Sequence, residues 1–199
     1  HALFLSARDI QIGRGEPISD TAKVLSRYVD GLMARTFGHD KVLQLAKHGT
    51  IPVINGLTDL LHPCQALSDL LTIREAFGRT QGLRLAYVGD GNNMAHSLMF
   101  AASKAGMDFA IAAPAGYQMD AGQVALGQVD ADAAGTALVQ TTDPAEAVAG
   151  AHVVYTDVWA SMGQEAEQAK REAAFEGFQV DNALMAAAEK DAIFMHCLP

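Results

Sequence analysis

The chain has 199 residues, is 50% hydrophobic and carries a formal net charge of −9, so it can bury one large core or two modest ones. This charge argues against general binding to the phosphate backbone of nucleic acid, and no apolar run approaches the roughly 20 residues of a membrane span. Without a recognisable signal peptide or a disulfide framework, it is expected to be reduced and cytoplasmic.

The first part of the chain alternates short apolar runs with amphipathic stretches. Strands are predicted at 3–5, 31–36 and 51–54, and helices at 19–29, at 40–47 and from residue 63 onward. Ser19 or Asp20 can cap the first helix. Pro63 is favourable at the first position of the third helix. The apolar stripe of that third helix is formed by Ala66, Leu70, Ile73 and Phe77.

Residues 78–82 are expected to join two domains, 1–77 and 78–199. In the second domain, strands are predicted at 83–88, 109–113, 137–140, 153–156 and 193–195, and helices at 94–105, 120–131, 144–149 and 164–175. Asp143 and Glu146 fit a capping box around Pro144. Such alternation predicts an α/β fold with two parallel-sheet domains, the second of them Rossmann-like, and ligands at the carboxyl ends of the strands.

The segment 89–93, Gly-Asp-Gly-Asn-Asn, follows a predicted strand and opens a predicted helix. It departs from the dinucleotide fingerprint, because Met94 stands where the third glycine is needed and no acidic residue follows the next strand. Two adjacent amides at a helix N-terminus suit a carboxylate instead. A capped turn, a carboxylate site and a nucleotide site all stay open on these residues alone.

His62 and Gln65 stand three residues apart in the sequence His-Pro-Cys-Gln, and therefore on one side of the predicted helix. An imidazole and an amide can together donate to a carbonyl oxygen and accept from an N–H group. The alternative is a histidine that only caps the helix. His62 and Cys64 are not expected to bind a metal, because no second pair follows at zinc-like spacing.

Three further polar residues follow strand-like runs. Asp157 begins a loop that contains Ser161, and this carboxylate and hydroxyl could hold an ammonium group or simply form a surface turn. Arg35, at the end of a strand, calls for an anion or a carboxylate partner. Cys197 is either an inert buried thiol or a group beside a reacting amine, and the local sequence does not decide between them.

Together, these motifs resemble the aspartate/ornithine carbamoyltransferase family, and the loop at 157–163 and the final His-Cys-Leu-Pro resemble its ornithine-using branch. The resemblance implies that the first domain binds carbamoyl phosphate and the second the amino acid, without metal or cofactor. The implied reaction transfers a carbamoyl group to the δ-amine of L-ornithine and gives citrulline and phosphate. It further implies a homotrimer or a multiple of trimers, and a place in arginine biosynthesis or breakdown.

The resemblance also assigns individual residues. The carbamoyl phosphate contacts are Arg35, His62 and Gln65, the adjoining Pro63 and Cys64, and Gln11. The amino-acid contacts are Asn93 at the α-carboxylate, Asp157, Ser161 and the Met162 backbone at the α-amine, and Cys197 with the Leu198 backbone beside the attacking amine. The expected catalytic residues are Arg35, His62 and Cys197, the first two stabilising charge on the carbonyl oxygen.

The family also carries a Ser-Thr-Arg-Thr-Arg segment that binds phosphate, and no such string occurs in this chain. We therefore expect an internal piece of a longer enzyme, or a truncated form that does not turn over alone. Two other hypotheses stay open. One is a non-catalytic binding module, which the missing segment favours, and the other is a nucleotide-dependent oxidoreductase, which the altered glycine pattern weakens.

Overall fold

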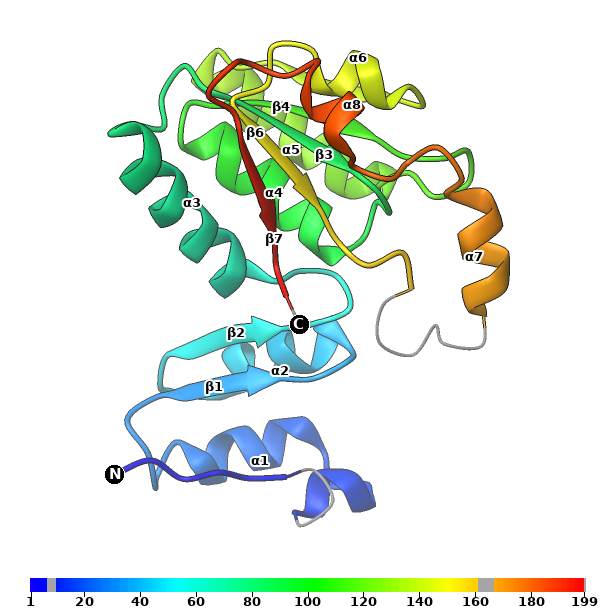
Figure 1. Ribbon diagram of the computed structural model, residues 1–199. Helices are drawn as coiled ribbons and strands as arrows, with labels where there is room; N and C mark the ends of the chain where they lie inside the picture. The colour runs from blue at the N-terminus through cyan, green and yellow to red at the C-terminus, as the bar shows by residue number, and fades with distance from the viewer. Residues whose placement is uncertain (7–9, 161–166, 199) are drawn as a thin grey trace. The chain divides into compact units, whose positions relative to one another are not determined.

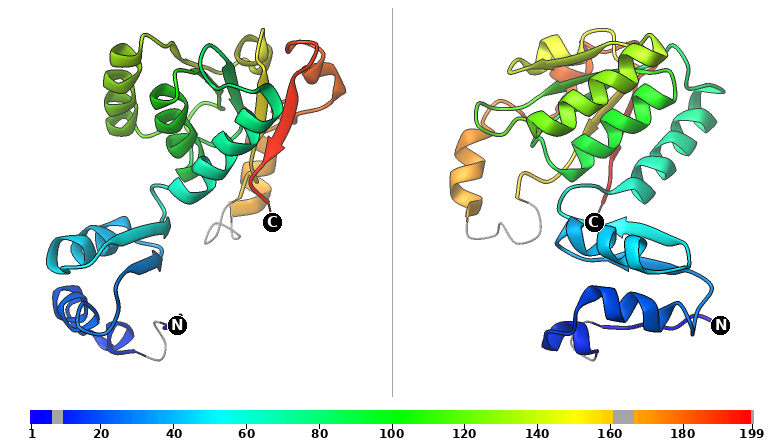
Figure 2. Two further views of the ribbon diagram at one scale, coloured as in Figure 1. Left: turned by 90° about the vertical axis from the view of Figure 1, so that its left-hand side faces the viewer. Right: turned by 180° about the vertical axis from the view of Figure 1, so that it is seen from behind.

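The computed structural model describes residues 1–6, 10–160 and 167–198. The chain divides into two compact units, His1–Cys64 and Gln65–Pro199, and each is described here by itself (Figure 1; Figure 2). Contacts therefore group most of the helix at residues 63–77 with the second unit. The division of function at residues 78–82 stays a prediction. None of the helices in the described part of the chain has the length and hydropathy that a membrane crossing requires.

The first unit is built on two parallel strands, β1 (Leu32–Arg35) and β2 (Val53–Leu57). Its helices α1 (Ile18–Leu25) and α2 (His39–His48) pack on each other, and a short 3-10 helix, η1 (Gln11–Arg14), precedes them. Both strands and both helices were predicted, with shifted ends. The strand predicted at residues 3–5 is wrong, because this run is exposed and pairs with no strand among the described residues.

Two shifted ends in the first unit have local causes. Helix α1 ends before residue 29 because the Ser26 hydroxyl donates to the carbonyl of Ala22 at 2.7 Å and accepts from the backbone of Thr50 at 3.0 Å, and such bonds compete with the helix. Strand β2 continues past its apolar residues through Gly56. A Cβ atom at Gly56 would collide with the Met33 side chain on β1, so glycine permits this close pairing.

The second unit contains a five-stranded, wholly parallel sheet in the order β5-β4-β3-β6-β7. Its strands are β3 (Arg84–Val88), β4 (Asp108–Ala112), β5 (Leu138–Thr141), β6 (Val153–Thr156) and β7 (Ile193–His196). All five were predicted from the apolar runs, and β6 has the predicted bounds. Parallel strands covered on both faces read as continuous apolar runs, as these do.

Helices cover both faces of this sheet, as predicted (Figure 1; Figure 2). They are α3 (Pro63–Phe77), α4 (Asn93–Lys104), α5 (Ala121–Ala134), α6 (Pro144–Val148), α7 (Gln168–Ala174) and α8 (Asn182–Met185). Residues of α3 and α4 pack with Tyr87 and Tyr155 on one face, whereas α6 and α8 pack with Val88 and Val154 on the other. Alternate residues of each strand therefore face opposite layers.

The helices of the second unit depart from the prediction at α6 and α8. At α6, Asp143 accepts from the backbone of Ala145 at 2.9 Å, but Glu146 accepts from the Thr141 hydroxyl instead of completing a capping box. Helix α8 was not predicted, because its four residues are too few to show a period, although Asp181 caps it. Residues 164–166 of the helix predicted at 164–175 lie outside the described residues. The described part of this prediction contains α7.

Candidate functional site

Three neighbouring strands end at the same edge of the second unit's sheet. The carboxyl ends of β3, β6 and β7 lead into residues 89–93, Asp157 and Cys197. The strand order also reverses here, because the chain places β4 and β5 on one side of β3, and β6 and β7 on the other. Open parallel sheets bind ligands beyond the carboxyl ends of the strands at such a reversal. This edge is therefore the candidate site.

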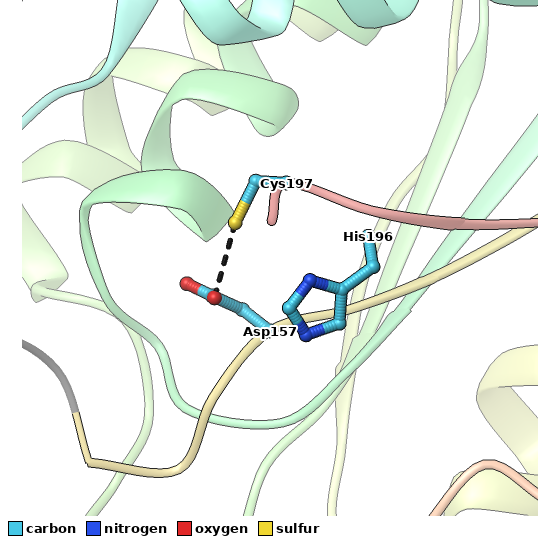
Figure 3. Close-up of side chains that lie close together, drawn as sticks. All are labelled: Asp157, His196 and Cys197. Atoms are coloured by element: carbon cyan, nitrogen blue, oxygen red, sulfur yellow. Dashed lines mark hydrogen bonds between the residues drawn. The ribbon is translucent and has the colours of Figure 1, made fainter. Parts of the chain in front are cut away.

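The carboxylate of Asp157 lies at the centre of this edge. Its Oδ2 accepts from Asn92 Nδ2 at 2.9 Å, and its Oδ1 accepts from the Cys197 thiol at 3.1 Å and from the backbone N–H of Val158 at 2.7 Å. Figure 3 shows the thiol directed at the carboxylate, with His196 beside them. Three motifs that are far apart in the sequence thus meet at one carboxylate.

The Asn92 amide has a fixed orientation. Its Oδ1 accepts from the backbone N–H groups of Met94 and Ala95 at 2.9 and 3.2 Å, and from the Tyr87 hydroxyl at 3.3 Å. Its NH2 group is therefore turned to Asp157. The capped turn that the sequence left open is present, with Asn92 as the N-cap of α4. Asn93 follows as the first helical residue, where the carboxylate contact stays a prediction.

Sequence reasoning missed a buried ion pair behind this segment. Arg171 Nη1 donates to Asp90 Oδ2 at 2.7 Å, and the two side chains are only 8% and 10% exposed. The same nitrogen donates to the carbonyl of Trp159 at 2.9 Å, and the guanidinium lies 5.1 Å from the centre of the Tyr117 ring. The pair therefore joins segment 89–93 to α7 and to the backbone that follows Asp157.

The environment of Asp90 opposes its charge. Burial raises the pKa of this carboxyl above its ordinary value, and the hydrogen bond and charge of Arg171 act in the other direction. Arg171 thus compensates a carboxylate that would otherwise be costly to bury. In the sequence, the pair is indicated only by Asp90, an acidic residue inside a glycine-rich turn. Its partner Arg171 stands 81 residues later.

Cys197 is a neutral thiol in this structure. Burial, followed by the hydrogen bond to Asp157 and the charge of that carboxylate, raises the pKa of the thiol to about 12. The protonated form is the one that donates to Asp157. If Cys197 acts beside a reacting amine, as the sequence predicts, it does so as a hydrogen-bonding thiol and not as a thiolate nucleophile.

Asp157, His196 and Cys197 are also the described residues that could hold a metal ion, since their ligand atoms lie within 4.8 Å of one another. They are donor types that Zn²⁺ takes in proteins. An ion here would have to displace the thiol proton that Asp157 accepts. His196 Nδ1 already accepts from the backbone N–H of Leu198 at 3.0 Å, which leaves Nε2 as its ligand atom. The absence of a metal stays a prediction.

A cavity of about 480 Å³ adjoins Asp157 and the ion pair. Its described lining comes from the end of β6, from the segment 157–160 that follows, from α7 and from the segment after α7. These residues are Thr156, Asp157, Val158, Trp159, Ala160, Gln168, Arg171, Glu172, Phe178, Gln179 and Val180. The predicted contacts Ser161 and Met162 lie outside the described residues.

The predicted residues of the first unit come from η1, from the end of β1 and from the beginning of α3 with the residue that precedes it. Exposed Arg35 ends β1, and the loops after β1 and β2 are joined where Asp59 N–H donates to the carbonyl of Phe37 at 2.8 Å. His62 directly precedes α3, whose first residue is Pro63 as predicted.

Three predicted residues make or accept hydrogen bonds within their own units. The Cys64 thiol donates to the carbonyl of Asn55 at 3.3 Å, and the backbone carbonyl of Gln11, an exposed residue of η1, accepts from Glu16 N–H at 3.1 Å. In the second unit, Gln65 donates to Asp69. Contacts between any of these residues and a ligand stay predictions.

The Asp/Orn binding domain of the aspartate/ornithine carbamoyltransferases matches residues 81–199, and the carbamoyl-P binding domain matches residues 1–75. The chain belongs to the aspartate/ornithine carbamoyltransferase family. It is 61% identical over 199 residues to an ornithine carbamoyltransferase of Anoxybacillus flavithermus, and 60% identical over 198 residues to one of Symbiobacterium thermophilum. These alignments cover 100% of this chain and 63% and 64% of the two relatives.

Solved structures of the family share the fold. The ornithine carbamoyltransferase of Pyrococcus furiosus matches with a TM-score of 0.95 and 53% identity, over 100% of this chain and 64% of that one. The anabolic enzyme of Campylobacter jejuni matches with a TM-score of 0.92 and 40% identity, over 99% of this chain and 65% of that one. The predicted α/β fold with parallel sheets is confirmed. This carbamoyltransferase-family chain spans somewhat under two thirds of its relatives' length.

Replacing Arg171 by Met should leave the buried charge of Asp90 without its partner and so destabilise the fold. We expect the free energy of unfolding at neutral pH to fall by about 3–5 kcal/mol, because the charge loses its partner. A carboxyl whose folded pKa is raised adds stability below its unfolded pKa and loses it as pH rises through the folded pKa. The deficit of Arg171→Met should therefore shrink as the pH is lowered.

Urea unfolding at neutral and acidic pH measures this effect. The matched control is the double variant Asp90→Asn/Arg171→Met, which removes the charge as well. It should be more stable than Arg171→Met at neutral pH and should lack the recovery in acid. A deficit in Arg171→Met that is the same at both pH values would contradict the assignment.

The raised pKa of Cys197 predicts slow alkylation at neutral pH. Iodoacetamide should modify exposed Cys64 first and Cys197 only slowly, because the thiolate is the reactive form. Asp157→Asn removes the neighbouring charge, so it should lower the pKa and accelerate labelling of Cys197 while leaving Cys64 unchanged. Mass spectrometry of the two peptides over time gives both rates. Labelling of Cys197 in the unsubstituted chain at the rate of Cys64 would refute this picture.

Proposed function

We propose that this chain carries the amino-acid site, and part of the carbamoyl phosphate site, of an enzyme that converts L-ornithine and carbamoyl phosphate to citrulline and phosphate. The observation that carries the proposal is the meeting of the motifs of β3, β6 and β7 at Asp157. Relatives that share at least 60% identity with this chain are named ornithine carbamoyltransferase.

The chemistry of the edge suits a free amino acid. Asp157 offers a carboxylate to the α-ammonium group, and Asn93, in the first turn of α4, offers an amide where the helix end favours the α-carboxylate. Cys197 offers a neutral thiol beside the side-chain amine. Putrescine lacks the α-carboxylate, and aspartate lacks the attacking δ-amine, so ornithine is the substrate that uses all three groups.

The reaction itself needs little covalent chemistry from the protein. The neutral δ-amine of ornithine forms a bond to the carbamoyl carbon, the bond from that carbon to the phosphate oxygen breaks, phosphate leaves and the amine loses a proton. Arg35 and His62 stabilise the charge that develops on the carbonyl oxygen. Holding the two substrates in line supplies much of the rate.

The finer assignments belong to the same proposal. Residues 1–77 serve carbamoyl phosphate and residues 78–199 serve ornithine, which the matches of the two family domains to 1–75 and 81–199 support. A trimeric assembly, a cytoplasmic location and a place in arginine biosynthesis follow from the resemblance. They are tested by the oligomeric state in solution, by localisation and by growth of an arginine auxotroph.

Ornithine-dependent citrulline formation tests the proposed function. It is measured on this chain and on a chimera in which the Anoxybacillus flavithermus relative supplies the sequence that this chain does not span. Aspartate and putrescine serve as control amines. Citrulline formation by the chimera with ornithine supports the proposal. If the chimera is active and the 199-residue chain is not, the supplied sequence has an essential role. A folded chimera that forms no citrulline would contradict it.

Replacing Asn93 and Asp157 together by Ala in this chimera should raise the KM for ornithine by about tenfold or more, since each position loses a charge-assisted hydrogen bond. The KM for carbamoyl phosphate should change far less. Steady-state kinetics with each substrate varied in turn measure the two values. An equal rise in both would show that these residues do not belong to the amino-acid site.

A further inference from the structure

Another buried carboxyl, besides that of Asp90, lies in α3. Asp69 is 3% exposed, and both of its oxygens are occupied. Its Oδ1 accepts from Gln65 Nε2 at 2.9 Å, and its Oδ2 accepts from the Tyr155 hydroxyl at 3.0 Å. A buried carboxylate is tolerated when donors satisfy it, and here the donors come from the preceding turn of α3 and from β6.

This arrangement orients the Gln65 amide. A carboxylate only accepts hydrogen bonds, so Gln65 must turn its NH2 group toward Asp69 and its carbonyl oxygen away. Burial raises the pKa of Asp69, whereas the hydrogen bonds from Gln65 and Tyr155 oppose that rise by favouring the ionised form. Gln65 therefore presents an acceptor to any group it meets on its other side.

Asp69 is itself held by the central sheet. Tyr155 is fully buried and stacks on Tyr87, with ring centres 6.0 Å apart and planes 16° apart. Tyr87 in turn donates to Asn92, which contacts Asp157. The carboxyl that orients Gln65 is thus fixed against the same two strands, β3 and β6, that lead into the candidate site.

We propose that Asp69 is a positioning residue that turns the carbonyl oxygen of Gln65 toward the NH2 group of the carbamoyl substrate, and thereby selects a carbamoyl over an acetyl group. The inference rests on the proposed function, in which Gln65 contacts the carbamoyl group. A carbamoyl group has an N–H donor where an acetyl group has only a methyl. An inverted amide would set two NH2 groups against each other and lose this discrimination.

Two nearly isosteric variants separate positioning from structural support. Asp69→Asn introduces an NH2 group that can face Gln65 and invert its amide. Tyr155→Phe removes the other hydrogen bond of the same carboxyl and leaves the Gln65 contact in place. In the chimera, Asp69→Asn should raise the KM for carbamoyl phosphate by about tenfold, with a smaller effect on the KM for ornithine. Tyr155→Phe should change neither value beyond about twofold.

Inhibition by acetyl phosphate supplies the specificity readout. Asp69→Asn should narrow the preference for carbamoyl over acetyl phosphate, and Tyr155→Phe should preserve it. In a Gln65→Ala background, Asp69→Asn should change neither the KM for carbamoyl phosphate nor the preference for carbamoyl over acetyl phosphate any further, because the side chain that Asp69 positions is gone. Additive effects of the two substitutions, or equal effects of Asp69→Asn and Tyr155→Phe, would overturn the proposal.

Side-chain amide NMR of the 199-residue chain tests the orientation without activity. The Gln65 NH2 signals should show one hydrogen-bonded proton in the unsubstituted chain and in Tyr155→Phe, and should lose this signature in Asp69→Asn. A signature that persists in Asp69→Asn overturns the positioning even if citrulline is formed. Failure of the proposed function is seen separately, as an unsubstituted chimera that forms no citrulline.

Discussion

The candidate site depends on the hydrogen bonds that the carboxylate of Asp157 accepts. This carboxylate accepts hydrogen bonds from the segment after β3, from the segment after β7 and from its own backbone. These segments meet because the three strands are parallel neighbours and the strand order reverses at β3. The same carboxylate accepts from the Asn92 amide and, together with burial as the larger cause, raises the pKa of the Cys197 thiol. One charge thus sets the donor and acceptor pattern of the edge.

A layer of buried polar side chains holds this edge in place. The Asp90–Arg171 pair joins segment 89–93 to α7, and Asp69 accepts from Tyr155, which stacks on Tyr87. Each of these carboxylates accepts at least one hydrogen bond from an element other than its own, and such pairing is how a low-dielectric interior tolerates polar groups. The apolar strands supply the stability, and these buried polar contacts specify how the strand ends are arranged.

The sequence predicts the fold better than it predicts the site. Alternating apolar runs located every strand of the second sheet, because parallel strands buried on both faces leave a strong signal. The pattern failed where the structure is polar or short, as at Gly56 in β2 and in helix α8. Which of the adjacent amides caps α4 depends on backbone geometry that the residue types do not encode. The ion pair of Arg171 with Asp90 was not predicted, because the two residues are 81 positions apart in the sequence.

Titration of the 199-residue chain with L-ornithine, followed by amide NMR, tests most directly whether the Asp157 edge is an amino-acid site. Saturable shifts are predicted for residues 89–93 and 157–159, which follow β3 and β6, and for residues 196–198 at the end of β7. Putrescine, which has no α-carboxylate, should leave residues 89–93 unchanged. Saturable shifts that lie elsewhere, or identical shifts with both amines, would contradict the assignment of this edge to the amino acid.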